Sequence, residues 1–143
     1  MADALSLNDA VAIIDGSLSK ARELNLVPLT IAVVDVGGQL IALKREDNSA
    51  LIRADLAIAK AWTAAAFRLS TGELEKRAQA RPWFFGSLAD MPSGKIVPVA
   101  GALPIYRNGE FIGAVGATGA QAADDEQCCL AGLESLGLKS TPA

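Results

Sequence analysis

Two segments with hairpin signals place the strongest limit on the fold. In the segment 30–45, the β-branched run TIAVVDV leads to Gly37-Gly38, and the chain returns as QLIALKR. In the segment 101–118, GALPIYR and EFIGAVGAT flank Asn108-Gly109, a pair that favours a type I′ turn. The run TIAVVDV is apolar on both sides, so we expect a central strand with both faces covered. The sequence therefore predicts an antiparallel sheet built from two hairpins.

Helical patterns surround and separate the two hairpins. We expect helices over residues 6–25 and 50–69, a short one from Ser70, and a last one over 122–136. Asn48 or Ser49 would cap the second helix, and Thr71 would form an imperfect capping box for the third. The order helix, hairpin, helices, hairpin, helix predicts an α+β fold, with one domain over residues 1–143.

The stretch 81–98 is the least regular part of the chain. It holds three of the six prolines and the aromatic run Trp83-Phe84-Phe85. We expect a long loop here, of the kind that forms lids or interface arms. The aromatic side chains would be buried under the loop or against another subunit.

Charge and hydropathy exclude several classes of binding partner. The net charge of −3 argues against nucleic acid or an anionic membrane, because both attract basic surfaces. No apolar run approaches the about 18 residues that a membrane span needs. The first ten residues, MADALSLNDA, lack the basic and apolar regions of a signal peptide, so we expect a cytoplasmic protein.

The chain contains no histidine. This absence excludes Ser-His-Asp and Cys-His nucleophile systems and removes the commonest zinc and haem ligand. Proton transfer near neutral pH would then need a carboxylate, lysine, cysteine, tyrosine or water. The two cysteines, Cys128 and Cys129, are adjacent in a predicted helix, so we expect reduced thiols.

The run RADLAIAKAWTAAAFR carries the first candidate site. Arg53, Lys60 and Arg68 fall on one stripe of the predicted helix, separated by alanines. The stripe could cradle a carboxylate, with Arg53 as a bidentate fork and Lys60 as a point charge. The alternative is a solvated helix face whose long side chains extend to water.

Further candidates lie at strand and helix ends. Arg45 and Asp47 follow the first hairpin and could line a pocket beside Lys60, or form a surface turn. Asp125 and Glu126 could act on a proton or only favour the helix start. For Asp35, before Gly37-Gly38, we favour hydrogen bonds to the turn backbone. An apolar wall for a conjugated ligand could come from aromatic side chains, namely Trp62, Trp83, Phe84 or Phe85.

The ordered segments IAVVDVGGQLIAL, KAWTAAAF, GALPIY, GEFIGAVGATG and DDE together resemble the GlcG/HbpS family of haem-degrading-like domains. The resemblance covers roughly residues 5 to 135. It implies a profilin-like sandwich: a central antiparallel sheet of about five strands with helices on both faces. It also implies homo-oligomers built from dimers, with an octamer as one option. Relatives bind haem or cobalamin-type tetrapyrroles or belong to catabolic pathways.

The resemblance also bears on individual residues. It strengthens Lys60, Arg45 and Asp47, and it places Thr118 where the family has a serine between glycines. The lack of histidine departs from haem-handling members and disfavours haem.

These observations together predict a small-molecule-binding protein. The expected ligand is an anionic, unsaturated carboxylate of a catabolic pathway such as aromatic degradation, changed by hydrolysis, deamination or tautomerisation. The candidate catalytic residues are Lys60, Asp125 and Glu126, and the candidate substrate-binding residues are Arg45, Asp47, Arg53, Trp62 and Thr118. No cofactor or metal is expected. The alternatives are a non-catalytic haem- or corrinoid-binding module and a structural or assembly protein.

Overall fold

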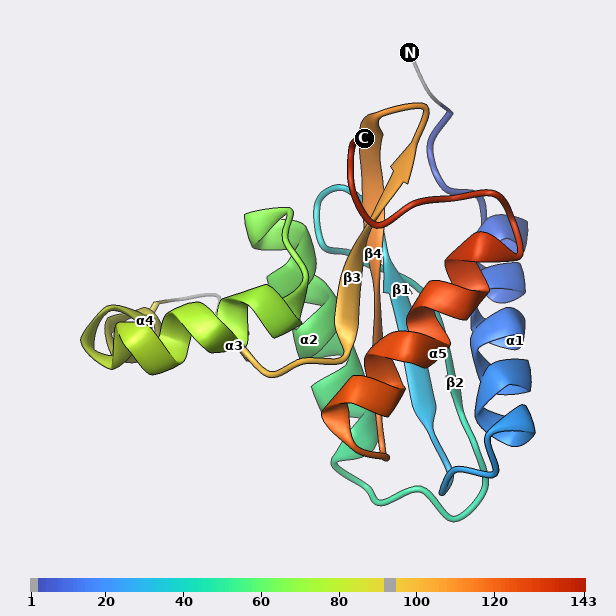
Figure 1. Ribbon diagram of the computed structural model, residues 1–143, viewed down its shortest axis with the longest axis horizontal. Coiled ribbons are helices and arrows are strands. Elements are labelled where there is room, and N and C mark those ends of the chain that lie inside the picture. The colour runs from blue at the N-terminus through green and yellow to red at the C-terminus, as the bar shows by residue number, and fades with distance from the viewer. Residues whose placement is uncertain (1–2, 92–94) are drawn as a thin grey trace.

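A four-stranded antiparallel sheet forms the centre of the protein, which we describe from a computed structural model covering residues 3–91 and 95–143. The strands are β1 (Thr30–Val34), β2 (Leu40–Arg45), β3 (Ala102–Arg107) and β4 (Glu110–Thr118), in the order β2-β1-β4-β3 (Figure 1). Both predicted hairpins are confirmed, and β1 is a central strand that is buried along its whole length.

The strand count differs from the expected five. A fifth strand at the β3 edge is reduced to one bridge, in which Tyr106 and Lys139 exchange backbone hydrogen bonds of 2.8 and 3.1 Å. Gly137, with φ of 70°, turns the chain just before this bridge, and Pro142 follows soon after it. The pairing therefore does not extend within the described residues.

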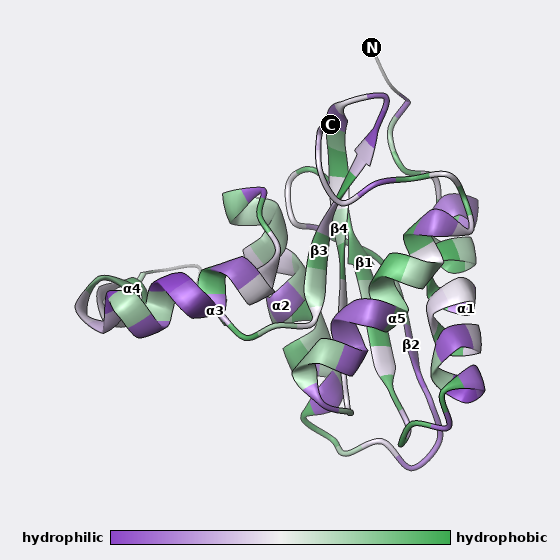
Figure 2. Ribbon diagram, in the orientation of Figure 1, coloured by the Kyte–Doolittle hydropathy of each residue, from purple (hydrophilic) through white to green (hydrophobic). Residues whose placement is uncertain are grey.

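Helices cover both faces of the sheet, as expected for the α+β sandwich. Helices α1 (Leu7–Glu23) and α5 (Ala122–Glu134) pack together on one face, and α2 (Arg53–Phe67) packs on the other (Figure 1). The core strands are mainly hydrophobic, whereas α1 and α3 carry many hydrophilic residues (Figure 2).

The alanine-rich character of α2 lets this helix approach the sheet closely. A Cβ atom at Gly116 of β4 would lie 2.6 Å from the carbonyl oxygen of Ala57 and 2.8 Å from the nitrogen of Ala61. Ala61 and Ala64 belong to the small cluster of buried apolar side chains between α2 and the sheet. The small residues at this contact therefore let α2 lie directly against β4.

The turns and caps follow local chemistry. Asn108 and Gly109 have φ of 53° and 81°, as the type I′ turn requires. The carboxylate of Asp35 accepts hydrogen bonds from the backbone of Gly37 (2.9 Å) and Gln39 (3.0 Å), which confirms the favoured role for this residue.

Two predicted caps are wrong. No side chain caps α2, which follows Ile52 after a turn, so neither Asn48 nor Ser49 serves it. Ser70, and not Thr71, caps α3 (Thr71–Ala80), because its hydroxyl accepts from the nitrogen of Glu73.

The expected loop over 81–98 contains a further helix, α4 (Pro82–Leu88), with proline in its first turn. Together, α3 and α4 extend away from the sheet (Figure 1). Trp83 is 70% exposed, while Phe85 stacks on Phe67 with ring centroids 6.0 Å apart. Residues 92–94 of this stretch lie outside the described part. No helix of the described chain is long and apolar enough to cross a membrane.

Candidate functional site

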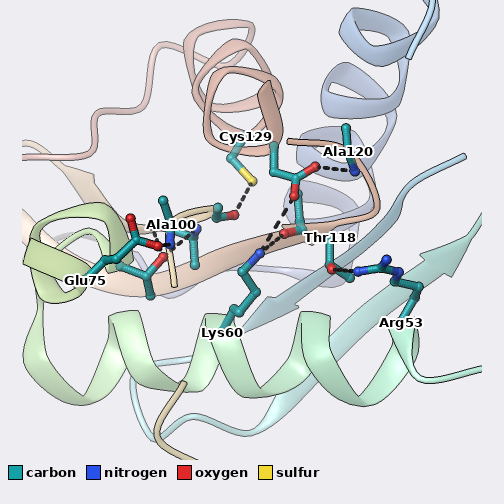
Figure 3. A network of polar contacts seen from close by, with 12 residues as sticks. Arg53, Lys60, Glu75, Ala100, Thr118, Ala120 and Cys129 are labelled. Atoms are coloured by element: carbon teal, nitrogen blue, oxygen red, sulfur yellow. Dashed lines mark hydrogen bonds and ion pairs between the residues drawn. The ribbon is translucent and has the colours of Figure 1, made fainter. Parts of the chain in front are cut away.

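The candidate site lies at the edge of the sheet where β3 begins. β4 continues to Thr118, past the start of β3 at Ala102. The carbonyl of Ala117 on this edge accepts a hydrogen bond from Lys60 Nζ at 2.9 Å (Figure 3). At this point, side chains from α2 and α5 meet around the sheet edge. The site lies here because β4 is longer than β3 and continues past the first residue of that strand.

Lys60 reaches the edge from the middle of α2. The residue is only 4% exposed, so its charge is largely removed from water. Gly101 makes room for it: a Cβ atom there would lie 2.5 Å from Lys60 Nζ, and its φ of +131° suits only glycine. Burial lowers the pKa of the Lys60 ammonium, against the attraction of Asp125, which raises it.

Asp125 faces Lys60 from the first turn of α5. Its Oδ2 lies 3.7 Å from Lys60 Nζ, and its Oδ1 accepts a hydrogen bond from the nitrogen of Ala120 at 3.1 Å. Burial raises the pKa of the Asp125 carboxyl to about 6, although Lys60 and the Ala120 hydrogen bond lower it. Burial thus favours the neutral form of both partners, and the pair can hold or release a proton near neutral pH.

Arg53 and Thr118 complete the polar side of the site. Arg53 Nη1 donates to Thr118 Oγ1 at 2.8 Å (Figure 3). This is the one hydrogen bond of the guanidinium within the described residues, so its remaining donors are available to a ligand. Arg53, Lys60, Thr118 and Asp125 line a pocket of about 310 Å³. The rest of the lining is mainly apolar: Leu56, Val97, Val99, Ala120, Gln121 and Ala122.

The neighbouring thiol does not supply a nucleophile. Cys129 Sγ donates to the carbonyl of Gly101 at 3.4 Å, and its side chain is fully buried. Burial raises the pKa of this thiol well above its ordinary value, and that of Cys128 to about 11. Since the thiolate is the reactive form, both cysteines are core residues. They are free, as expected.

The structure brings together four of the eight predicted site residues: Arg53, Lys60, Thr118 and Asp125. Arg45 and Asp47 line a separate hollow of about 420 Å³, beside Arg22 and Glu46. In that hollow Glu46 holds Arg22 at 3.2 Å. The two residues therefore do not lie beside Lys60.

The other predicted residues lie elsewhere. Trp62 packs on the first hairpin, next to Gly38, and Glu126 lines a larger hollow of about 470 Å³ that also contains Arg68. The guanidinium of Arg68 lies 4.7 Å from the centre of the Phe111 ring. Of the basic stripe, only Arg53 and Lys60 serve the pocket.

Sequence reasoning missed the apolar side of the pocket. Val97 and Val99 belong to an irregular segment without a repeating pattern, so nothing in the sequence placed them beside α2. Ala122 could have been found, because it lies one helical turn before Asp125. Within the described residues, no group of three or more metal-ligating side chains is present.

Comparisons with known proteins support a binding role. The family model described as haem degrading protein HbpS-like matches residues 5–134. Protein GlcG of Escherichia coli is 36% identical over 112 residues, which are 78% of this chain and 79% of that protein. The corrinoid adenosyltransferase PduO of Salmonella typhimurium is 31% identical over 85% of this chain but only 36% of its own length. A crystal structure of a PduOC:heme complex superimposes with a TM-score of 0.87 at 27% identity, covering 97% of this chain and 99% of that one.

These relatives correct one prediction. The expectation of no cofactor is wrong, because a similar domain is known as a haem complex and similar proteins include corrinoid adenosyltransferases. The prediction used the absence of histidine, which removes one iron ligand only. A protein can also bind a tetrapyrrole through its ring and its carboxylate groups, and these contacts do not need histidine.

Proposed function

This chain belongs to the HbpS-like family, and we propose that it is a module that binds a carboxylate-bearing small molecule, with a tetrapyrrole such as haem as the leading ligand. The observation that carries the proposal is the pair of cations, Arg53 and Lys60, lining one pocket with mostly apolar walls. Few precisely placed polar groups within an apolar lining are typical of ligand sites.

The two cations have different parts in binding. Arg53 would hold a carboxylate through its planar fork, steadied by Thr118. Lys60 would add a buried charge whose geometry is fixed by the carbonyl of Ala117. Because both groups are held before the ligand arrives, little order is lost on binding.

The residues present fit the acid side chains of haem and do not fit its iron. Haem iron is usually held by histidine, cysteine thiolate, methionine or tyrosine. The chain has no histidine, and no cysteine, methionine or tyrosine is among the described residues that line the pocket. Binding would rest on the carboxylates and the ring and not on an iron ligand from the pocket.

A second candidate function is acid–base catalysis on an unsaturated carboxylate, such as hydrolysis, deamination or tautomerisation. The Lys60–Asp125 pair favours it, because a buried pair 3.7 Å apart can accept and return a proton. A panel of conjugated carboxylates, followed by absorbance, tests this candidate. Turnover that persists in Lys60→Met would contradict it.

A haem titration tests the binding proposal. We expect a Soret shift that saturates near one haem per chain, with Arg53→Gln weakening the affinity about 10- to 100-fold, the loss expected for a charged hydrogen bond. Arg45→Gln is the matched control, since Arg45 lines a different hollow. No saturable shift, or equal losses in both variants, would overturn the proposal.

A further inference from the structure

The amine of Lys60 has features that binding a carboxylate does not require. Lys60 belongs to the pocket lining, yet the residue is only 4% exposed. Its side chain extends from α2 to the start of β3, where it lies against Gly101. The adjacent acid, Asp125, lies 3.7 Å from the nitrogen and comes from the opposite helix layer. The enclosed position also suits a reactive amine with its own proton donor.

We propose that Lys60 forms an imine with the carbonyl group of a small carbonyl acid, such as a 2-oxo acid, whose carboxylate is held by Arg53. The inference deepens the proposed function and rests on its claim that Arg53 recognises a carboxylate. Imine formation needs a neutral amine, a group that gives and takes protons, and loss of the carbonyl oxygen as water. In this pocket Lys60 is the candidate amine and Asp125 is the candidate proton carrier.

The step balances within the site. The lone pair of the Lys60 nitrogen forms a bond to the carbonyl carbon while the carbonyl oxygen takes a proton from Asp125, which gives a carbinolamine. The nitrogen then returns a proton to the Asp125 carboxylate. Asp125 passes this proton to the hydroxyl group, which leaves as water, and the nitrogen forms the C=N bond of a protonated imine. The Asp125 carboxylate then takes the remaining N–H proton, which gives the neutral imine and restores the acid. The sum is amine plus carbonyl giving imine plus water, and no oxidant or reductant takes part.

The surroundings of the Lys60 amine support this chemistry. Burial lowers the pKa of the Lys60 ammonium, which favours the neutral amine, and the nearby Arg53 acts in the same direction. Asp125 has a pKa of about 6, so both of its forms are populated near neutral pH. Val97, Val99 and Leu56 would shield the imine from water on the remaining sides. The pocket of about 310 Å³ has room for a small carbonyl acid.

Trapping by borohydride is the direct test. The purified protein is incubated with pyruvate and sodium borohydride, and the adduct is counted by intact mass and placed by peptide mapping. We expect one adduct per chain, at Lys60. Lys44, which pairs with Asp15 on the surface, is the internal control and stays unmodified. No adduct at Lys60, or modification spread evenly over exposed lysines, would overturn the proposal.

Two comparisons separate this inference from the proposed function. Acetone, which has a carbonyl group and no carboxylate, should label Lys60 about tenfold less, since it cannot use the charged hydrogen bond to Arg53. Lys60→Arg has no primary amine and should lose the adduct. If haem and carboxylates bind but nothing is trapped, only the imine fails. If acetone and pyruvate label Lys60 equally and haem does not bind, the carboxylate site fails.

Discussion

Replacing Asp125 by asparagine should raise the stability of the protein relative to wild type as the pH increases from 4 to 7, although it removes one half of a buried ion pair. The side chain of Asp125 is 3% exposed, and burial raises its carboxyl pKa from 3.8 to about 6. A raised carboxyl pKa means that the folded state binds this proton more tightly than the unfolded state. Its contribution to stability is present below pH 4 and is lost as the pH rises through 6. Asparagine resembles the protonated form at every pH.

The magnitude follows from the pKa. A change from 3.8 to about 6 corresponds to about 3 kcal/mol, at about 1.4 kcal/mol per unit of pKa. Asparagine keeps the acceptor for the Ala120 nitrogen and turns its amide nitrogen toward Lys60. That contact costs part of the gain at all pH values while Lys60 is charged. We therefore expect the stability difference, Asp125→Asn minus wild type, to increase by about 2–3 kcal/mol between pH 4 and pH 7.

Urea unfolding of both proteins at several pH values measures this difference, because every other titrating group largely cancels between them. The Lys60 ammonium changes the stability difference in the same direction, because removing the Asp125 carboxylate lowers the pKa of Lys60 further. A difference that stays flat, or that moves against the variant as pH rises, would refute the reasoning. It would show that the Lys60–Asp125 pair stabilises the fold on balance.

The remaining predictions concern packing, capping and the shape of the pocket. Gly116→Ala should cost about 2 kcal/mol or more in unfolding free energy, because its Cβ atom would lie 2.6 Å from the carbonyl oxygen of Ala57 and push α2 from the sheet. An unchanged thermal midpoint would contradict this close approach. Ser70→Ala should cost about 1 kcal/mol by removing the cap of α3, and Ser70→Asp should restore it in the same urea assay. Gly101→Ala should displace the amine of Lys60 and weaken ligand binding more than Gly116→Ala does, as measured by titration; equal losses would count against the placement of the amine.

Local signals predicted most of the fold. Asn108-Gly109 specifies its turn because both residues tolerate positive φ. The apolar run of β1 specifies a strand that is buried on both faces of the sheet. Helix α4 was missed because Pro82 was taken as a loop signal, whereas proline fits the first turn of a helix. The expected count of about five strands came from the family resemblance, and the structure has four because the last pairing is limited to the bridge between Tyr106 and Lys139.

The site was only half predictable. Helical spacing correctly put Arg53 and Lys60 on one side of α2, seven residues apart. Whether Asp125 faces Lys60 depends on how α5 packs on the sheet, and the sequence alone does not predict that packing. Arg45 was misplaced because nearness along the chain to Arg53 was taken as nearness in space. Its guanidinium instead donates to the carbonyl of Ser49 at 3.2 Å and lines a separate hollow.

The claim that Arg53 and Lys60 form a carboxylate site is tested most directly by one pair of ligands. Protoporphyrin IX and its dimethyl ester share the same ring, and only the free acid carries carboxylates. We expect the acid to bind wild-type protein about tenfold or more tightly than the ester, measured by absorbance titration in one solvent, and this preference to be smaller in Arg53→Gln. Equal affinities of acid and ester for the wild-type protein would contradict the account.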